Sequence, residues 1–432
     1  MTPDTVRVGL LGCGNVGAAL VELIGQRSDA IAARTGLRLE VARVAVRSLA
    51  KERPVTLPVG VATLDAAGLV VDPEIDVVVE VIGGIEPARE LILAALKAGK
   101  PVVTGNKELL ANVGAELFSA AEEAGVDLLF EAAVAGGIPF IRPLRESLAG
   151  ERIDRILGIV NGTTNYILTR MTEAGASYAD ALSEAQSLGL AERDPTADVE
   201  GYDAAAKAAI IASIAFGVRV VAGDVFNEGI SGITTADIDY AAKMGYVVKL
   251  LAIAEHHDGP GGGEVAVRVH PAMVPADHPL ASVRDSFNAV FVEGDAVGDL
   301  MFYGRGAGGS PTASAVLGDL IDAAVNRTKG GHASVGTLRK PRIRPIDEVE
   351  TAYYLNLDVL DRPGVLAAVA GVFGRHGVSI RSMEQEGLGD EARLVFITHV
   401  AREADVQATI RDLHHLDAVD RITSVLRVVG SS

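Results

Sequence analysis

Cysteine and positive charge are both scarce in this sequence. Its 432 residues include a single cysteine, Cys13, which excludes an intrachain disulfide or a multi-cysteine zinc site and favours a reducing compartment, the cytoplasm by default. Lysine and arginine number 39 against 57 aspartates and glutamates, for a net charge of −18. That charge would repel phosphates, so nucleic acids and anionic membranes are poor partners.

Long apolar runs and a targeting segment are also missing. No apolar run reaches the roughly 18 residues that a membrane span needs, and residues 208–218 are bracketed by Lys207 and Arg219. The N-terminus carries Asp4 and a glycine-rich turn in place of a basic leader. The remaining composition, 49% apolar and 22% charged, is typical of a globular fold, and the length favours several domains.

Residues 1–137 alternate short apolar runs with helical patterns, which predicts a Rossmann-type nucleotide-binding domain with a parallel, doubly wound α/β sheet. Residues 138–302 mix strands with two apolar helices, so we expect a second, α+β domain there, and the family resemblance given below implies that it is the catalytic and dimerisation domain. A helix at 312–326 would complete the first domain through residues 303–326. Further elements are expected as strands at 6–11, 41–46, 77–82, 102–104, 128–131, 153–161 and 265–269, and helices at 88–98, 109–124, 179–188 and 203–216.

The C-terminal part reads as a linker followed by a small module. Residues 327–350 are rich in glycine, proline and basic side chains, which is typical of a linker. Residues 351–432 show the order βαββαβ of a ferredoxin-like unit. Its elements are expected at 353–360, 365–376, 379–385, 393–399, 403–413 and 422–428.

A glycine motif follows the first expected strand. Gly12, Gly14 and Gly17 form G-x-G-x-x-G, with Asn15 and Val16 inside it, directly before a helix. This context favours a dinucleotide loop in which the helix N-terminus faces a pyrophosphate, over an ordinary glycine turn.

The end of the second strand carries cations where an NAD site would usually carry an acid. Arg47 and Lys51 follow that strand, and positive charge there suits the 2′-phosphate of NADP(H). The alternative is solvated surface charge, and NAD(H) remains possible.

Two polar segments are candidates for the reacting end of the site. Lys107 opens a helix after a strand, where an ammonium can orient or protonate a carbonyl oxygen, although a surface charge is the commoner role. Residues 161–166, Asn-Gly-Thr-Thr-Asn-Tyr, suit the polar ends of an amino acid or, equally, a helix cap.

Residues 189–207 carry five carboxylates at and before the start of an apolar helix. Asp203 and Lys207 are spaced i, i+4, so they share one helical face. Burial lowers the pKa of a lysine unless a carboxylate offsets the effect, and such a pair suits proton transfer. A capping cluster with a simple ion pair is the alternative.

The paired histidines 256–257 and 414–415 point apart and favour surface positions over a metal site, and Cys13 is a small filler of the glycine loop.

Together these motifs resemble the homoserine dehydrogenase family, in its monofunctional form with a C-terminal ACT regulatory domain. The resemblance covers essentially the whole chain. Its carriers are the glycine loop, Val-Ile-Gly-Gly at 81–84, Gly-Asn-Lys at 105–107, residues 161–166, the 192–207 stretch and Gly-Ala-Gly-Gly at 306–309. Gly105 stands where the family motif has alanine.

The resemblance implies interconversion of L-homoserine and L-aspartate 4-semialdehyde with NAD(P), in the route to threonine, methionine and isoleucine. It makes Lys207 and Lys107 the acid/base lysines. Cofactor contacts would come from Gly12, Gly14, Asn15, Val16, Gly17, Arg47, Lys51, Gly83, Lys107 and Gly308. Substrate contacts would come from Gly162, Thr163, Gly189, Glu192, Asp198, Asp203 and Lys207.

The resemblance also implies a monovalent cation, sodium or potassium, held by the Glu131 carboxylate and the carbonyls of Val134, Gly136 and Ile138, an oxygen set that suits a hard cation. It implies a homodimer or homotetramer and L-threonine as the effector of the ACT domain. That module could instead serve assembly alone.

Two other functions fit this sequence less well. A semialdehyde dehydrogenase needs a catalytic cysteine away from the cofactor loop, and the chain has none. A non-catalytic amino-acid sensor would leave the paired lysines and carboxylates without a task.

Overall fold

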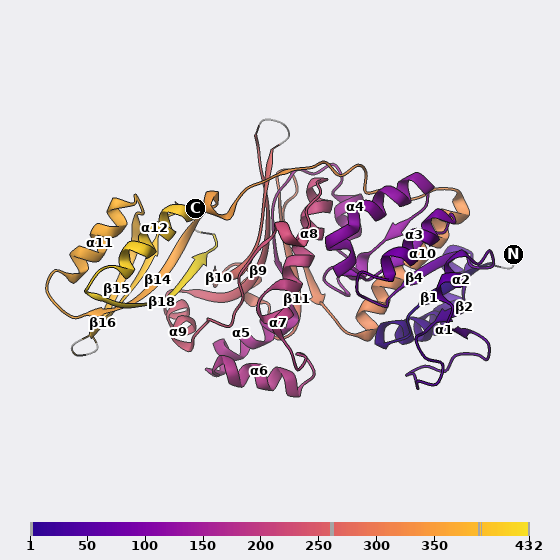
Figure 1. The fold of residues 1–432 in the computed structure, drawn as a ribbon, viewed down its shortest axis with the longest axis horizontal. Helices are drawn as coiled ribbons and strands as arrows, with labels where there is room; N and C mark the ends of the chain where they lie inside the picture. Colours follow the sequence, from indigo (N-terminus) through magenta and orange to yellow (C-terminus); the bar gives the residue numbers. More distant parts are fainter. Residues whose placement is uncertain (1–2, 260–262, 388, 390, 431–432) are drawn as a thin grey trace. The chain divides into compact units, whose positions relative to one another are not determined.

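The computed structural model describes residues 3–259, 263–387, 389 and 391–430 (Figure 1). The chain forms two compact units. Three of the boundaries between them fall inside a secondary-structure element: β7 (Ile153–Ile159), α8 (Tyr202–Phe216) and β11 (Phe287–Gly294). The first unit comprises Met1–Ile156, Ala206–Val225 and Asn288–Pro341, and the second comprises Leu157–Ala205, Phe226–Phe287 and Arg342–Ser432.

The first unit is built on a parallel sheet. Its strands are β1 (Asp4–Leu11), β2 (Leu37–Ala45), β3 (Ala62–Thr63), β4 (Val77–Glu80), β5 (Val102–Thr104) and β6 (Leu128–Leu129). They lie in the order β3-β2-β1-β4-β5-β6. β1 pairs in parallel with β2 on one side and with β4 on the other, so the strand order reverses at β1. Sheets of this kind bind ligands at the carboxyl ends of the strands beside that point.

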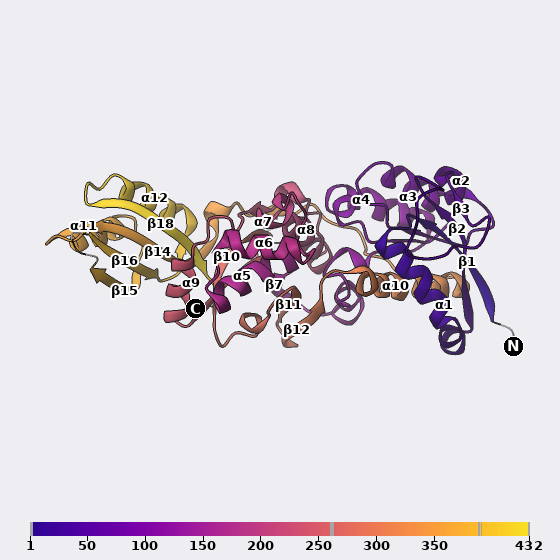
Figure 2. The same cartoon turned by 90° about the horizontal axis from the view of Figure 1, so that it is seen from below.

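Helices cover both faces of this sheet (Figure 2). One face carries α1 (Asn15–Thr35) and α10 (Gly309–Lys329), which pack side by side although they are far apart in sequence. Leu20 and Ile24 of α1 and Val316 and Leu320 of α10 recur every four residues and are buried against the sheet. The other face carries α2 (Ala66–Val71), α3 (Ala88–Lys97) and α4 (Lys107–Ala124). The Rossmann-like expectation is therefore correct.

The second unit combines helices with a long hairpin. It contains α5 (Gly162–Ala174), α6 (Tyr178–Ser187), α7 (Thr196–Val199), β8 (Phe226–Asn227), α9 (Thr235–Lys243), β9 (Tyr246–His257) and β10 (Glu264–Pro275). β9 and β10 pair antiparallel along their whole length, and β8 pairs in parallel with β10. β9 is buried along most of its length because its central residues are apolar apart from Lys249, whose Nζ donates to Asn165 Oδ1 at 3.1 Å.

The C-terminal module has the expected βαββαβ order. Its elements are β14 (Glu350–Leu360), α11 (Val365–Arg375), β15 (Ile380–Gly387), β16 (Glu391–Thr398), β17 (Ala401–Arg402), α12 (Glu403–His414) and β18 (Val419–Val428). The sheet order is β18-β14-β16-β15, and α11 and α12 lie together on one face of it (Figures 1 and 2). A closed apolar core of Leu355, Val369, Phe373, Phe396 and Leu413 fills the space between helices and sheet.

Some boundaries differ from the sequence prediction. Strand β2 begins at Leu37, four residues earlier than expected, and α10 extends at both ends of its predicted range. The expected linker carries β13 (Arg342–Ile343), which pairs in parallel with β10, and the Arg342 guanidinium lies 2.7 Å from the carboxylate of its register partner Glu264. The remaining elements are β12 (Gly298–Arg305) and the short helical turns η1 (Glu131–Ala133), η2 (Pro143–Ser147), η3 (Ala222–Asp224), η4 (Pro279–Ser282) and η5 (Ile346–Glu348).

Within the described residues, none of the helices combines the length and the hydrophobicity needed to cross a bilayer.

Candidate active site

The glycine loop between β1 and α1 has the backbone shape of a dinucleotide site. Gly12 adopts a left-handed φ of +98°, and a Cβ there would lie 2.9 Å from the Val81 carbonyl oxygen. A Cβ on Gly17 would lie 2.3 Å from the Gly12 oxygen, whereas one on Gly14 would enter open space. Two glycines are therefore required by packing, and the third leaves room before the N-terminus of α1. That room fits the pyrophosphate of NAD(P).

The glycine run before α10 lies against the same loop. A Cβ on Gly309 would be 3.3 Å from the Asn15 carbonyl oxygen. Gly308 precedes α10 with a φ of +122°, which only glycine adopts easily. The predicted cofactor residues Asn15 and Gly308 thus come together although nearly 300 residues separate them in sequence.

A buried carboxylate organises the carboxyl ends of β4 and β5. Glu80 Oε1 accepts hydrogen bonds from the backbone N–H groups of Ile82 and Gly83, and Oε2 accepts one from the Thr104 hydroxyl at 2.5 Å. Thr104 Oγ1 in turn accepts from the Asn106 N–H at 3.0 Å. This network holds the predicted cofactor residue Gly83 beside the start of α4.

Asn106 and Lys107 form the start of α4. Asn106 Oδ1 caps the helix by accepting from the Leu109 N–H at 3.1 Å, and its Nδ2 donates to the Gly84 oxygen at 2.7 Å. Lys107 is the first helical residue and is half-buried. Its backbone is thereby fixed at the ligand-binding edge of the sheet.

The proposed 2′-phosphate residues Arg47 and Lys51 are exposed in the segment after β2. Sequence reasoning missed a third cation there, Arg53, whose guanidinium donates to the backbone oxygens of Lys51, at 2.9 Å, and Ser48. Burial raises the pKa of the Cys13 thiol, and the positive charge of Arg53 opposes that shift. Arg53 therefore lies close to the glycine loop and orders the cationic segment.

Asn161 is the centre of the polar cluster in the second unit. Its Oδ1 caps α5 by accepting from the Thr164 N–H at 2.9 Å. Its Nδ2 donates to Asp198 Oδ1 at 2.7 Å and to Asp203 Oδ2 at 2.9 Å. Three separate segments are thus joined by one amide. Asn161 was not among the predicted site residues, although its place in the polar run directly before them was a signal for it.

The other predicted substrate residues differ in their surroundings. Thr163 Oγ1 donates to the Leu190 oxygen at 2.6 Å, and Gly162 leaves no space for a Cβ, which would lie 2.7 Å from the Ser286 oxygen. Gly189 ends α6 with a φ of +71°. Glu192 is exposed in the turn between α6 and α7, whereas Asp203 is 8% exposed. The structure therefore groups Asp198 and Asp203 around Asn161 and leaves Glu192 on the surface.

Lys207 follows Asp203 by one turn of α8 and is 9% exposed. The helical spacing expected from the sequence is therefore present. Alanines and isoleucines around it on α8 are buried as well, including Ala208, Ile210 and Ile211. A charged amine at such a position is held in a largely apolar helix.

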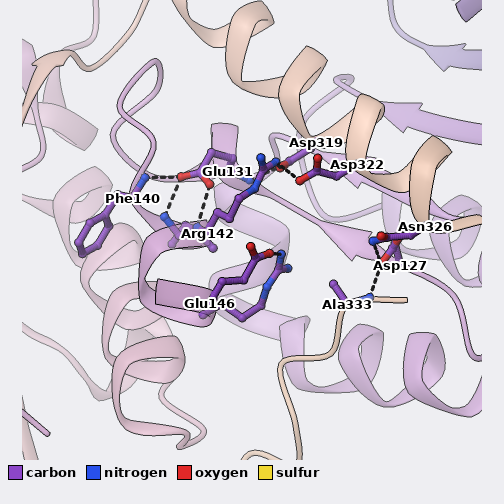
Figure 3. Close-up of polar contacts among 11 residues, drawn as sticks. Asp127, Glu131, Phe140, Arg142, Glu146, Asp319, Asp322, Asn326 and Ala333 are labelled. Atoms are coloured by element: carbon purple, nitrogen blue, oxygen red, sulfur yellow. Dashed lines mark hydrogen bonds and ion pairs between the residues drawn. The ribbon is translucent and has the colours of Figure 1, made fainter. Parts of the chain in front are cut away.

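Glu131, the predicted cation ligand, lies in a helical turn instead of the predicted strand (Figure 3). Its carboxylate accepts the backbone N–H groups of Phe140, Ile141 and Arg142 at 2.5, 2.7 and 2.8 Å. These three bonds end the strand early because they turn the chain toward the start of the next helical segment. A carboxylate has about four acceptor positions, so one remains for a cation.

The turn at 134–138 lies in sequence between Glu131 and residues 140–142, whose N–H groups bond to its carboxylate. Val134 and Ile138 are buried, and Ala135 and Gly136 have left-handed φ values of +56° and +54°. Carbonyl oxygens together with one carboxylate form a donor set that fits a hard monovalent cation.

A second carboxylate supports Glu131 from α10 (Figure 3). Asp319 Oδ2 accepts from the Glu131 N–H at 2.7 Å, and Oδ1 lies 3.2 Å from Arg142 Nη2. Burial raises the pKa of Asp319 to about 7, despite these partners. Arg142 also contacts Asp322 at 2.5 Å, so α10 is tied to this segment by charge as well as by packing.

Comparison with known proteins assigns these features to one family. Residues 139–321 match the family model described as homoserine dehydrogenase, and residues 12–131 match that of the homoserine dehydrogenase NAD binding domain. The homoserine dehydrogenase of Corynebacterium glutamicum is 53% identical over 427 residues, which cover 98% of this chain and 96% of that protein.

The chain belongs to the homoserine dehydrogenase family. Residues 353–417 match the ACT domain model, so the C-terminal module is an ACT domain. Among solved structures, a homoserine dehydrogenase from Thiobacillus denitrificans superposes with a TM-score of 0.93 at 43% identity and covers 99% of both chains. A hyperthermophilic archaeal homoserine dehydrogenase in complex with NADPH covers 74% of this chain and 98% of its own, with a TM-score of 0.61 and 30% identity.

Membership of the homoserine dehydrogenase family makes this protein an oxidoreductase with an NAD-binding Rossmann-like domain. The glycine loop combines close backbone packing with room before α1, and the Asn161 cluster joins polar side chains from three segments. They are the basis for assigning individual residues.

Proposed function

We propose that this homoserine dehydrogenase uses Lys207 as its acid/base group in the interconversion of L-homoserine and L-aspartate 4-semialdehyde. The observation that carries the proposal is the Asn161 cluster, because it joins Asp198 to Asp203, and Asp203 lies one helical turn before Lys207. When bound, NADP(H) supplies or accepts the hydride. In the reductive direction Lys207 gives its proton to the oxygen of the growing alkoxide, and in the oxidative direction it takes the hydroxyl proton back.

The carboxylates recognise the amino-acid part of the substrate. Asp198 and Asp203 present negative charge suited to the ammonium group of homoserine, and Asn161 keeps both in place. Gly162, Thr163 and Gly189 shape the backbone next to them. Glu192 completes the set as a more exposed carboxylate.

Lys107 orients the carbonyl and stabilises the developing negative charge on its oxygen. Its position at the start of α4, beside Gly83, supports this role. A lysine fixed by a capped helix needs little reorganisation as charge develops.

The cofactor preferred by this enzyme is NADP(H), with NAD(H) accepted less well. Arg47, Lys51 and Arg53 form a cationic segment after β2 that suits a 2′-phosphate. The archaeal relative carries NADPH in its complex. Homoserine-dependent reduction of NADP, compared with that of NAD under the same conditions, tests both the activity and this preference.

A sodium or potassium ion bound by Glu131 and the carbonyls of Val134, Gly136 and Ile138 stabilises the segment before η2. Its test is thermal unfolding in sodium, potassium and a bulky organic cation at equal ionic strength. Higher stability in one of the small cations, lost in Glu131→Gln, is the expected result. Equal stability in all three salts contradicts it.

The enzyme works in the cytoplasm, as a homodimer or homotetramer, in the route to threonine, methionine and isoleucine.

L-Threonine inhibits it through the ACT domain. The turn at 361–365 supports this, since Gly364 has a φ of +91° at the start of α11 and a larger residue there would strain the ligand loop.

The regulatory proposal has two variants as its test. Truncation after Pro345 should abolish threonine inhibition, although it also exposes β10, which pairs with β18. Gly364→Asp is the milder change and should weaken inhibition with little effect on uninhibited turnover. Undiminished inhibition in both variants would place the effector elsewhere, and no inhibition of the intact enzyme would leave the domain a role in assembly.

A further inference from the structure

One side-chain contact joins the ACT domain to the loop that follows β8. Arg427 Nη1 on β18 donates to Glu228 Oε2 at 2.8 Å. The Arg427 side chain is 7% exposed and that of Glu228 is 43% exposed. The Arg427 side chain is therefore buried, whereas the Glu228 side chain is accessible to solvent.

Arg427 is held rigidly within the ACT domain. Its Nε and Nη2 donate to the two Glu403 oxygens, both at 2.9 Å. Burial raises the pKa of Glu403, but hydrogen bonds from Arg427, Tyr353 and Gln407 outweigh it and hold the pKa below its ordinary value. Because Glu403 binds Nε and Nη2, the guanidinium group of Arg427 has a fixed orientation. Its Nη1 is the atom that donates to Glu228.

The Glu228 loop contacts the backbone at 199–201. The Ile230 N–H donates to the Val199 oxygen at 2.8 Å, and Asn227 Nδ2 donates to the Glu200 oxygen at 3.0 Å. A Cβ on Gly229 would lie 2.4 Å from the Val199 oxygen. The two backbones are thus in close contact, and one cannot shift without the other.

Val199 is the last residue of α7, which carries Asp198, and Glu200 and Gly201 connect α7 to α8, which carries Asp203. Both carboxylates are bound to Asn161 Nδ2. A displacement of the Glu228 loop therefore changes the spacing of the carboxylates that one amide must bridge. Misplacement of a binding group by a small distance is enough to weaken ligand affinity.

We infer that the Arg427–Glu228 ion pair couples the ACT domain to the Asp198 and Asp203 carboxylates, with Glu228 as a positioning residue for homoserine binding. The inference rests on the proposed function, which assigns these carboxylates to the substrate. Coupling of this kind is reciprocal, so homoserine binding must also act on β18.

Glu228→Ala in the full-length enzyme is the main test. It leaves the Arg427–Glu403 pair intact and should raise KM for homoserine about fivefold or more, the lower end of typical coupling between sites. The turnover number and KM for NADP should stay within about twofold, because the change acts on substrate position. Glu228→Gln, which keeps an oxygen acceptor, should recover part of the affinity.

Arg421→Gln is the matched control. Arg421 lies on the same strand and pairs with Asp358 inside the ACT domain at 2.7 Å. It should leave KM for homoserine unchanged. An equal rise in KM in this control, or no rise in Glu228→Ala, overturns the inference.

Hydrogen exchange supplies the reciprocal measurement. Saturating L-homoserine should slow amide exchange in the peptide covering β18 in the intact enzyme and not in Glu228→Ala. Unchanged exchange in the intact enzyme also overturns the inference. An intact enzyme that fails to reduce NADP with homoserine refutes the proposed function instead, and a thermal melt of each variant checks that it is folded.

Discussion

The glycine loop and the Asn161 cluster are organised by different means. The glycine loop is defined by backbone shape, since Gly12 and Gly17 leave no space for a side chain and Gly14 leaves room beside a helix start. The cluster is defined by side chains, since one amide holds two carboxylates from other segments. The first kind of site depends on a contiguous run of residues. The second depends on how distant segments fold together.

The largest expected effect comes from removing the amine next to the cluster. Lys207→Ala should lower turnover by about 100-fold or more, the usual scale for losing a general acid or base. Steady-state rates with homoserine and NADP measure it, and a thermal melt checks folding. If Lys207→Ala keeps near-native turnover and Lys107→Ala loses it, the two lysines have exchanged roles. If both variants keep it, the mechanism is wrong.

Asn161 should be the next most sensitive position. Asn161→Ala should reduce kcat/KM for homoserine at least about tenfold, because an acceptor that loses its buried donor costs about 1–3 kcal/mol. Asn161→Asp keeps the oxygen that caps α5 but replaces the amide donor with a negative charge beside Asp198 and Asp203. It should be at least as damaging in kinetics as Asn161→Ala. Normal kinetics in Asn161→Asp would leave Asn161 with a capping role only.

Gly14→Ala tests the proposal that the open space at Gly14 in the glycine loop holds the pyrophosphate. The new Cβ meets no protein atom within 4 Å, so the fold should be unaffected. It enters the room assigned to the pyrophosphate, and KM for NADP and NAD should rise together by about tenfold, equivalent to about 1.4 kcal/mol of binding. Gly25→Ala in α1 is the control, since its Cβ also meets open space. Unchanged KM in Gly14→Ala would move the pyrophosphate elsewhere.

Arg47 tests whether side chains add selectivity to the backbone site. Arg47→Asp should raise KM for NADP about tenfold relative to that for NAD, through loss of charge-assisted bonds to a 2′-phosphate. Arg53→Gln should have a smaller effect of the same kind, since Arg53 orders the segment. The exposed Arg27→Asp on α1 is a charge-matched control. Equal effects on both cofactors remove Arg47 from the site.

Asp319 should have the smallest effect on activity and a measurable effect on stability. Its folded pKa of about 7 lies above that of an unfolded aspartate, so its contribution to stability is complete below about pH 4 and is lost as the pH rises toward 7. The loss amounts to at most about 1.4 kcal/mol per pH unit. Denaturant unfolding of the intact protein and Asp319→Asn between pH 5 and 8 measures the difference.

Comparing the intact protein with Asp319→Asn also separates the contribution of Asp319 to pH-dependent stability from that of His270, another buried titratable group. Burial lowers the pKa of His270 well below its ordinary value, so His270 favours folding at higher pH in both proteins and cancels in the difference. Asp319→Asn should show a flatter decline with rising pH than the intact protein. Parallel curves would mean that Asp319 is ionised across this range.

Local patterns were enough for most of the fold. The glycine loop, the alternation of strands and helices and the βαββαβ module were all predictable because each depends on periodicity within one segment. The strand predicted at 128–131 was too long, since Glu131 is taken by three N–H groups from residues 140–142. The segment expected to be a linker also carries β13, which pairs with β10. In both cases the bonding partner lies outside the local window.

The sequence by itself determined the family, the NAD-binding and ACT domains, and the helical spacing of Asp203 and Lys207, because short-range periodicity and contiguous motifs carry that information. Only the tertiary structure decided that Asn161 joins Asp198 to Asp203, that Gly309 meets Asn15, that Arg53 approaches the glycine loop and that Arg427 reaches Glu228. Each of these contacts joins residues far apart in the chain. Their meeting depends on how packed elements are placed in space, and no local pattern of residues encodes that placement.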